Sequence, residues 1–376
     1  MAEHAVALTG GSAPSRRFEE LDAIRGVAAL IVVLFHIYGS RSPDEHMLAS
    51  FEFDGIANLA ITTLFGGTGA VTLFFVLSGC VLAESLAGAN RLTGRLYVTF
   101  AVKRLFRLLP VAWCSIGLAI VLMLDYYHMQ VPWAALLPAL CLDREAAGVF
   151  NGPLWSINVE MLASLVFPIL LFASRWGRFP GRVVLLLLLV WLTRYAGHVY
   201  LLTYLFCFQL GIMARELITP VVARLSASVS GWAFMVACGL VLASTNASRI
   251  GWITSQTHVM LEGIGAVYLI GYVLSPAGNR VVRVLKTGPL LFLGAISYSL
   301  YAFHYPIVSM LDWVSWGYVS SDRYLLAQTL CATLAVPTCI LAAWLANVLI
   351  ERPSQRMGRA LARRIQQSSQ GLIVWV

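Results

Sequence analysis

Long apolar stretches separated by short polar loops make up most of the chain from residue 21 onward. A membrane-spanning helix needs about 20 mainly apolar residues, and ten segments approach or exceed that length. They lie near 21–40, 62–86, 105–124, 153–174, 182–197, 199–216, 230–245, 256–275, 288–312 and 324–350. The pattern therefore predicts an all-α, polytopic integral membrane bundle of about ten transmembrane helices.

The remaining segments divide the chain further. The apolar piece 131–142 contains Pro132 and Pro138 and is too short to span, so we expect a re-entrant or interfacial segment. No internal repeat is visible, and a repeat would favour a transporter. The expected parts of the chain are a polar tail over 1–17, a membrane domain over 18–356 and a basic tail over 357–376.

Composition agrees with a membrane protein. Hydrophobic residues make up 59% of the chain and charged residues only 12%, whereas soluble domains carry about 25% charged residues. The seven cysteines lie mostly in apolar runs without a metal-like spacing, so we expect small core residues and no metal. The net charge of +8 does not indicate nucleic acid, because in membrane proteins the location of basic residues matters more than their sum.

Most of the 26 Lys and Arg residues fall in the two tails and in the loops on one side of the expected bundle. By the positive-inside rule that side faces the cytoplasm. We therefore expect a multi-pass protein of the inner membrane with both termini cytoplasmic.

The first apolar segment contains two unusual residues, Arg25 and His36, eleven positions apart. On a helix they point the same way, about 16 Å apart along the axis, and Asp22 is within reach of Arg25 for an ion pair. Charged or titratable groups inside a membrane helix indicate a functional site. Either residue alone would also fit a snorkelling arginine or a hydrogen-bonded core histidine.

Two further titratable residues are expected at the depth of His36. Glu160 follows the start of an inward-running helix, and His304 lies late in an outward-running one. A histidine beside a carboxylate is a plausible general base. The alternatives are a buried hydrogen bond of Glu160 to the backbone or to Trp155, and a packing role for His304 beside Pro306.

A basic cluster is expected at the cytoplasmic side. Arg104 and Arg107 share one helix face, and Glu351 at the end of the last helix could pair with one of them. Such a rim suits a phosphorylated ligand, although membrane anchoring and lipid headgroup contact explain it equally well. An elongated anionic donor such as acyl-coenzyme A fits the rim and the reach to His36, and so does a lipid phosphate.

Taken together, the motifs resemble acyltransferase family 3, the membrane O-acyltransferases that modify bacterial cell-surface glycans. The matching motifs occur in the family's order over about residues 18–356. They are Arg25-x10-His36, Phe74-Phe-Val-Leu-Ser-Gly79, Arg104-x-x-Arg107-x-x-Pro110, Pro153-Leu-Trp-Ser-x-x-x-Glu160, Phe208-Gln-Leu-Gly211, Ile296-Ser-Tyr-Ser-Leu-Tyr-x-x-His304-x-Pro306 and Ile350-Glu-Arg-Pro353. Cys80 departs from the family pattern, and the extracytoplasmic hydrolase-like domain of some members is absent from this sequence.

The resemblance implies transfer of an acyl group, often acetyl, from cytoplasmic acyl-coenzyme A to a hydroxyl of a surface polysaccharide or its lipid-linked precursor. It makes His36 the catalytic histidine and gives Arg25 and the inner arginines a role in donor binding. Glu160 would orient or balance His36. The expected supporting residues are Asp22, Ser78, Trp155, Ser156, His304 and Glu351.

Two other functions remain open from the sequence: O-acylation of a small metabolite or lipid, and transport of anionic glycans or lipids. Membrane lipids are expected partners in every case, and nucleic acid is not. Whether His36 acts as a general base or carries the acyl group itself is not decided by the residues, and neither is the oligomeric state.

Overall fold

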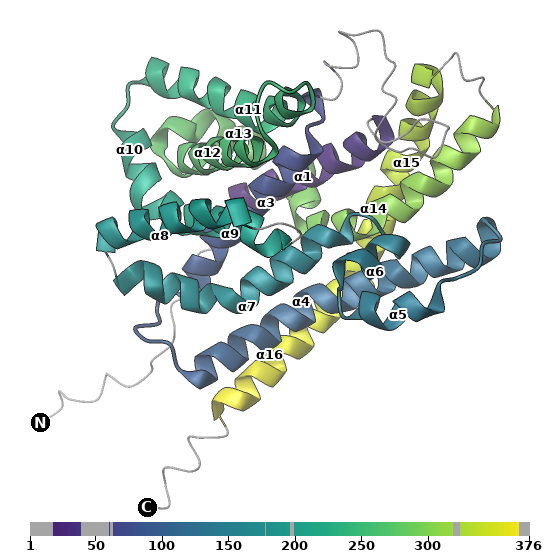
Figure 1. Cartoon of the computed structure of the whole chain (residues 1–376), viewed down its shortest axis with the longest axis horizontal. Coiled ribbons are helices and arrows are strands. Elements are labelled where there is room, and N and C mark those ends of the chain that lie inside the picture. The colour runs from purple at the N-terminus through teal and green to yellow at the C-terminus, as the bar shows by residue number, and fades with distance from the viewer. Residues whose placement is uncertain are drawn as a thin grey trace, which may run out of the picture.

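The chain folds into a bundle of helices (Figure 1), and no strand occurs in the part described here. The computed structural model describes residues 18–38, 60, 63–176, 178–195, 199–318 and 324–367, without the side chains of 313–318 and 324–327. Its α-helices are α1 (Glu19–Tyr38), α3 (Gly67–Ser85), α4 (Gly94–Val121), α5 (Trp133–Leu140), α6 (Arg144–Phe150), α7 (Leu154–Trp176), α8 (Arg178–Leu192), α9 (Tyr200–Met213), α10 (Thr219–Ala223), α11 (Ala227–Arg249), α12 (Ser255–Leu274), α13 (Asn279–Leu285), α14 (Gly288–Tyr318), α15 (Tyr324–Ala346) and α16 (Arg352–Gln367).

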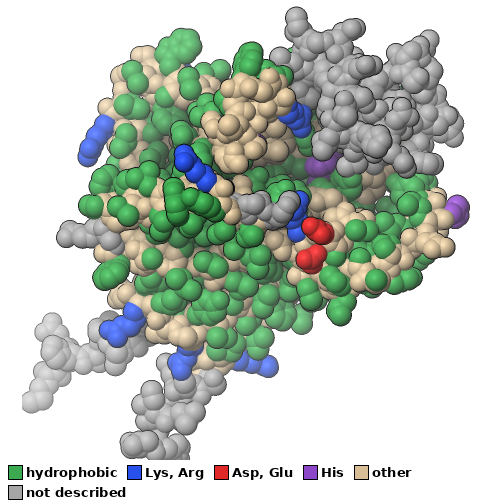
Figure 2. Space-filling model, in the orientation of Figure 1, with side chains coloured by type: hydrophobic (Ala, Val, Ile, Leu, Met, Phe, Trp, Pro, Cys, Tyr) green, Lys and Arg blue, Asp and Glu red, His purple; other side chains and the backbone are tan. Residues whose placement is uncertain are grey.

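Nine helices in these ranges are long and apolar enough to cross a membrane, judged by length and composition. Hydrophobic side chains cover most of the face shown in Figure 2. The expected all-α membrane bundle is therefore confirmed. The segment expected over 182–197 is shorter than the length needed to be counted as a spanning helix. Its described part is α8, with 15 residues, followed by a 3₁₀ turn over Thr193–Tyr195.

The chain nevertheless returns across the bundle along α8. The starts of α7 and α9 lie together, as shown by Trp155 and Tyr200, whose ring centroids are 5.4 Å apart. Their ends also lie together, where the Gln209 amide donates to Ser174 over 3.1 Å. Two consecutive long helices that run in the same direction need a crossing between them, and α8 joins the end of α7 to the start of α9. With the nine helices above, α8 brings the crossings within the described residues to ten, in agreement with the pattern.

One end of the bundle, here called the basic end, gathers the starts of α1 and α14 and the ends of α3, α7 and α9. Lys286 pairs with Glu20 at 3.3 Å, and Arg215 pairs with Glu84. Arg175 donates to the Ala89 carbonyl over 3.0 Å. Exposed tryptophans lie near both ends of the bundle, as in the aromatic belts of membrane proteins.

The last helical stretch is longer than a membrane is thick. Residues Gln328–Gln367 form 40 continuous helical residues, about 60 Å, against about 30 Å of hydrocarbon. The residues of α16 that face α4 are small, and a Cβ on Gly358 would lie 2.6 Å from the Phe106 Cβ. The region expected as a basic tail from residue 357 is thus helical up to 367 and packs along α4 (Figure 1).

A buried carboxylate joins three helices in the half of the bundle away from the basic end. Glu262 of α12 is fully buried. Its carboxylate accepts hydrogen bonds from Thr72 at 2.7 Å and Thr68 at 3.1 Å on α3, and from Thr245 at 2.6 Å on α11. The sequence pattern around Glu262 indicates no role for it. Its contacts indicate that it holds α3, α11 and α12 together.

We expect Glu262→Ala to destabilise the protein, because three threonine hydroxyls would lose their acceptor. The loss should be about 1–3 kcal/mol of unfolding free energy. Glu262→Gln should lose less, since its amide keeps an acceptor oxygen. Thermal denaturation of the purified protein measures the effect, with the exposed Glu145→Ala as control. Equal melting temperatures for Glu262→Ala and Glu145→Ala would contradict the role.

Candidate active site

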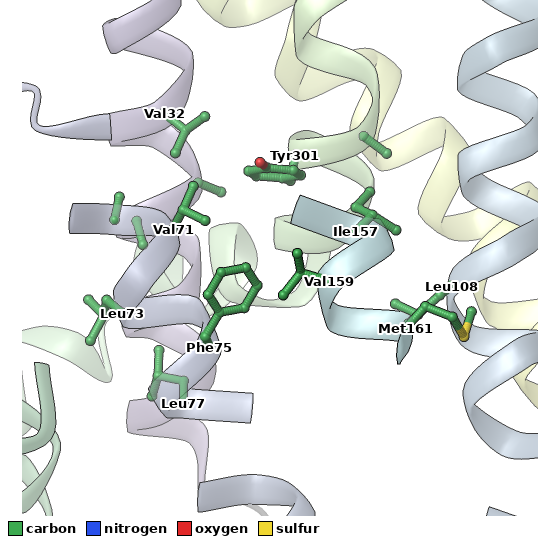
Figure 3. Packing of buried hydrophobic residues seen from close by; sticks show 14 of the residues in the cluster. Val32, Val71, Leu73, Phe75, Leu77, Leu108, Ile157, Val159, Met161 and Tyr301 are labelled. Atoms are coloured by element: carbon green, nitrogen blue, oxygen red, sulfur yellow. The ribbon is translucent and has the colours of Figure 1, made fainter. Parts of the chain in front are cut away.

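The candidate site lies where α1, α3, α4, α7 and α14 meet. Two glycines allow α1 and α14 to touch through their backbones: a Cβ on Gly26 would lie 2.5 Å from Gly294 N, and one on Gly294 would lie 2.5 Å from the Asp22 carbonyl. Buried apolar side chains of these helices pack against one another in the core (Figure 3). The close approach fixes Arg25, the neighbour of Gly26, against α14.

A large polar cavity opens at the basic end between α1, α4, α14 and the start of α16. Its volume is about 700 Å³, within the range of small-molecule sites. The charged residues of its wall are Asp22, Arg25, Arg107, Glu351, Arg352 and Arg359. Four arginines against two acids give the wall an excess of positive charge, so the cavity suits an anionic ligand.

Three arginines lie close together near the inner end of this cavity; Arg25 and Arg107 line it, whereas Arg104 lies behind them and lines neither cavity. Arg25 is only 8% exposed, forms an ion pair with Asp22 at 3.6 Å, and lies within electrostatic range of Arg107 and Glu160. The buried Nε of Arg104 has no hydrogen-bond partner among the described residues. Three guanidinium groups face two carboxylates here, which leaves one positive charge without a counter-ion among these five residues.

A narrow cavity of about 40 Å³ continues toward the middle of the bundle. It shares Arg25 and Arg107 with the large cavity, so the two adjoin. Ser78 donates to the Glu160 carboxylate over 3.1 Å along its wall.

Tyr301 closes the deep part of the narrow cavity. In Figure 3 its ring lies between Val71 of α3 and Ile157 of α7, and all three residues line the cavity. Its hydroxyl lies 2.5 Å from the Ser156 hydroxyl. A pair of hydroxyl groups is therefore held at the end of the cavity farthest from the arginines.

Beyond Tyr301 lie two histidines in contact. His304 is fully buried, and its Nε2 lies 3.2 Å from Nδ1 of His36. Tyr301 and His304 are three residues apart on α14 with ring centroids 5.6 Å apart. Ser297, Tyr301 and His304 share one face of α14, which runs for about 10 Å from the large cavity to the histidines.

Carbonyl groups determine which ring nitrogens carry protons. Nδ1 of His304 contacts the Tyr301 carbonyl at 2.6 Å, and Nδ1 of His36 contacts the Val32 carbonyl at 2.9 Å. A carbonyl only accepts, so both Nδ1 atoms carry hydrogen in the neutral rings. The one Nδ1 hydrogen of His36 is then shared between the Val32 carbonyl and Nε2 of His304, and Nε2 of His36 carries the lone pair. That nitrogen is the basic atom of the pair.

Glu351 is positioned by an irregular turn. Residues Asn347–Glu351 form a π-helix between α15 and α16, a feature that frequently occurs at functional sites. The Glu351 carboxylate accepts from Ser299 at 2.7 Å, Asn347 at 2.9 Å and Gln355 at 3.0 Å. Among the described residues Glu351 forms no ion pair with an arginine of α4, so that prediction is wrong. Neutral groups donate the hydrogen bonds to this carboxylate instead.

Several other sequence predictions concern contacts that the structure describes. The ion pair of Asp22 with Arg25 and the proximity of the inner arginines are confirmed. His304 lies at the depth of His36 as expected, and the two rings are in contact. Trp155 lines neither cavity and packs at a tilt against Tyr200 instead.

Glu160 is the main difference from the expected arrangement. It was placed beside His36, but its carboxylate lies with Ser78 and within electrostatic range of Arg25. The reason is that α7 begins inside the bundle: Asn151, just before it, is fully buried and donates to the Ala302 carbonyl over 2.8 Å. A residue count that starts α7 at the membrane surface therefore predicts a position for Glu160 too far from the basic end.

Three residues of this site belong to the matching motif over 296–306, but the sequence indicated no role for them. Ser297, Tyr298 and Tyr301 line the cavities, and Tyr298 donates to the Leu108 carbonyl over 2.5 Å. Their spacing could have identified two of them. Ser297 and Tyr301 precede His304 by seven and three residues, which places all three on the same helix face.

Comparison with known proteins gives the same assignment as the motifs. The family model described as "Acyltransferase domain" matches residues 18–347. The chain is 26% identical over 337 residues to a putative membrane-bound transacylase, BcsY, of Komagataeibacter xylinus, which covers 80% of this chain and 75% of that protein.

A second relative is acyltransferase MdmB of Streptomyces mycarofaciens, 32% identical over 164 residues, or 41% of this chain. The chain spans only 39% of that relative's length. No solved structure matches. Because the family model covers nearly the whole membrane bundle, including the arginine cluster and the histidine pair, this chain belongs to acyltransferase family 3 and is a membrane acyltransferase.

Proposed function

We propose that the protein transfers an acyl group, most simply acetyl, from acyl-coenzyme A to a hydroxyl of a surface polysaccharide or its lipid-linked precursor. The observation that carries this proposal is the order of groups along α14: the arginine-lined cavity adjoins the narrow cavity, the narrow cavity ends at Tyr301, and Tyr301 lies beside the histidine pair. A donor with an anionic head and a long arm would bind the arginines and extend its reactive end toward His36.

The arginines would hold the phosphate groups of the donor. Guanidinium groups make bidentate, charge-assisted hydrogen bonds to phosphate. Arg25, Arg104 and Arg107 exceed the acids beside them by one charge, and a phosphate group would balance it. The cavity of about 700 Å³ offers room for such a head.

The reach of the donor also fits. Arg25 and His36 are separated by about 16 Å along α1, and the face of α14 that joins the cavity to His304 contains hydroxyl groups that can hydrogen-bond a polar arm. A thioester at the end of such an arm would lie beside Tyr301 and the histidines.

The chemistry at His36 would be general-base catalysis. Nε2 of His36 takes the proton of the acceptor hydroxyl while its oxygen attacks the thioester carbonyl carbon. The carbon–sulfur bond then breaks, and the proton passes from His36 to the leaving thiolate. The products are the O-acyl ester and the free thiol. An acyl-histidine intermediate would give the same products in two steps.

His304 would orient the base. Its Nε2 accepts from Nδ1 of His36, which keeps the proton off Nε2 of His36 and stabilises the imidazolium that forms, as the aspartate does in a serine-protease triad. Unlike an aspartate, His304 is neutral, so it stabilises the charge less.

Replacing His304 tests this orienting role. We expect His304→Leu to lower the acylation rate about 10–100-fold, the loss typical of partners that orient metal-bound histidines. His304→Gln should recover part of it, because an amide oxygen still accepts from His36. Initial rates are compared at equal protein level in the membrane. A rate for His304→Leu equal to wild type would contradict the role.

The direct test of the proposed function is thiol release from acetyl-coenzyme A by the purified full-length protein, with and without a glycan acceptor. Acceptor-dependent release of one thiol for each ester formed would support it. A transporter of anionic glycans or lipids would release none. If a small hydroxylated metabolite supports release and glycans do not, the alternative acceptor class is favoured.

The basic end is proposed to face the cytoplasm of an inner-membrane protein, because exposed Lys and Arg gather there. Reporter fusions at residue 20 and after residue 356 should both report a cytoplasmic location. An extracytoplasmic signal at either position would place the arginine-lined cavity on the wrong side for cytoplasmic acyl-coenzyme A.

A further inference from the structure

A third cavity, of about 230 Å³, lies beside a different face of α1. Apolar side chains and the thiol of Cys238 form its whole wall, and they come from α1, α3, α11, α12 and α13. On α1 they include Ile24, Val27 and Ile31. This face lies about 120° around the helix from Arg25 and His36, so one helix separates the apolar groove from the candidate active site.

The groove runs from the basic end toward the middle of the bundle. Val281 and Leu285 of α13 line it at the basic end. Phe234 and Leu242 of α11 also line it, about 12 Å apart along that helix. Near Leu242, α3 packs on the backbone of α11, since a Cβ on Gly66 would lie 2.7 Å from the Leu242 carbonyl oxygen. The groove is thus long and narrow, and it is closed at the end that lies in the middle of the bundle.

Hydrocarbon is the occupant that suits such a wall. Ordered water needs two to four polar partners, and this wall offers none to it. Ile24, Val27, Phe234 and Cys238 are only partly buried, so the groove is open to its surroundings. Those surroundings are bilayer at the depth of these spanning helices. One lipid chain can therefore enter from the side.

The helix that lines the basic end of the groove also carries two exposed arginines. On α13, Val281 and Leu285 face the groove, whereas Arg280 and Arg283 are exposed. These two arginines are three residues apart and share a face. No acidic residue occurs on α13. The short helix thus joins an apolar wall to two arginines that have no acidic partner among the described residues, at the membrane surface.

We propose that this groove binds one acyl chain of an anionic phospholipid, whose phosphate contacts Arg280 and Arg283. This site is separate from the donor cavity and does not depend on the proposed function. The bound chain packs against Ile24, Val27 and Ile31 of α1. It thereby supports the helix that carries Arg25 and His36.

The test uses the full-length protein reconstituted in bilayers of phosphatidylglycerol and phosphatidylcholine, then released and measured by native mass spectrometry. The wild type should retain one phosphatidylglycerol. Cys238→Phe fills the groove and should lose it. Val236→Phe is the matched control, because Val236 is on the same helix, is 61% exposed and lies outside the wall. It should retain the lipid.

The headgroup part is tested by the surface variant Arg280→Gln/Arg283→Gln, which leaves the groove intact. A preference of about 30-fold for phosphatidylglycerol, about fivefold per arginine, should disappear while chain binding persists. Melting temperatures confirm that each variant is folded. Lipid retention by folded Cys238→Phe equal to that of Val236→Phe would overturn the site. An unchanged headgroup preference in the double variant would overturn the role of the arginines.

Discussion

His36→Ala is expected to lower acyl transfer by about 10²–10⁴-fold, the usual contribution of a positioned general base. Nε2 of His36 carries the lone pair in the tautomer set by Val32 and His304. Between Gly26 and Tyr38 of α1, no other described side chain is a histidine or a carboxylate. His36→Gln should fail as well, because an amide can hydrogen-bond but cannot take a proton near neutral pH.

Both variants should still reach the membrane, since each replaces a polar ring with a group no more costly to bury. The exposed His128→Gln is the control for losing a histidine outside the site. Ester formation is measured at equal membrane protein level. Near-normal acylation by His36→Ala would remove the proposed mechanism and leave the family assignment intact.

The second large effect is expected at Arg107. Its guanidinium lies where the two cavities adjoin and makes no ion pair or hydrogen bond with any described residue. Arg107→Ala should raise KM for acyl-coenzyme A about 10–100-fold, the equivalent of one charge-assisted hydrogen bond of about 1.5–3 kcal/mol. Arg107→Lys should recover part of the loss, because it keeps the charge without the planar fork.

A matched control comes from the same helix. Arg95 is exposed near the start of α4 and lines neither cavity, so Arg95→Ala should leave KM unchanged. Steady-state kinetics over a range of acetyl-coenzyme A concentrations separates the two variants. If Arg107→Ala and Arg95→Ala have the same KM, the arginines of α4 serve as membrane anchors alone.

Local pattern was enough for much of the fold. The apolar runs predicted the spanning helices because a bilayer forces each crossing to satisfy its own backbone hydrogen bonds. The helical repeat alone placed Asp22 and Arg25 within ion-pair distance. The exception was α8, whose 15 residues are fewer than the length rule expects. Its crossing is visible only from the parallel arrangement of α7 and α9.

Contacts between helices were predicted less well. Glu160 was expected at the depth of His36 because each helix was counted from the membrane surface. The buried Asn151 shows that α7 starts inside the bundle. The starting depth of a helix depends on its neighbours, so no count along one segment supplies it.

The sequence by itself determined the membrane class, the helical architecture, the family motifs and the shared face of Arg25 and His36, because periodicity and hydrophobicity act along one segment. Only the tertiary structure decided that His304, 268 residues away, contacts His36. It also decided that Glu160 lies near the arginines and that Tyr301 closes the path between the two groups. Those outcomes depend on where helices cross, and the crossings are set by close backbone approaches such as Gly26 against Gly294, which pack segments remote in sequence.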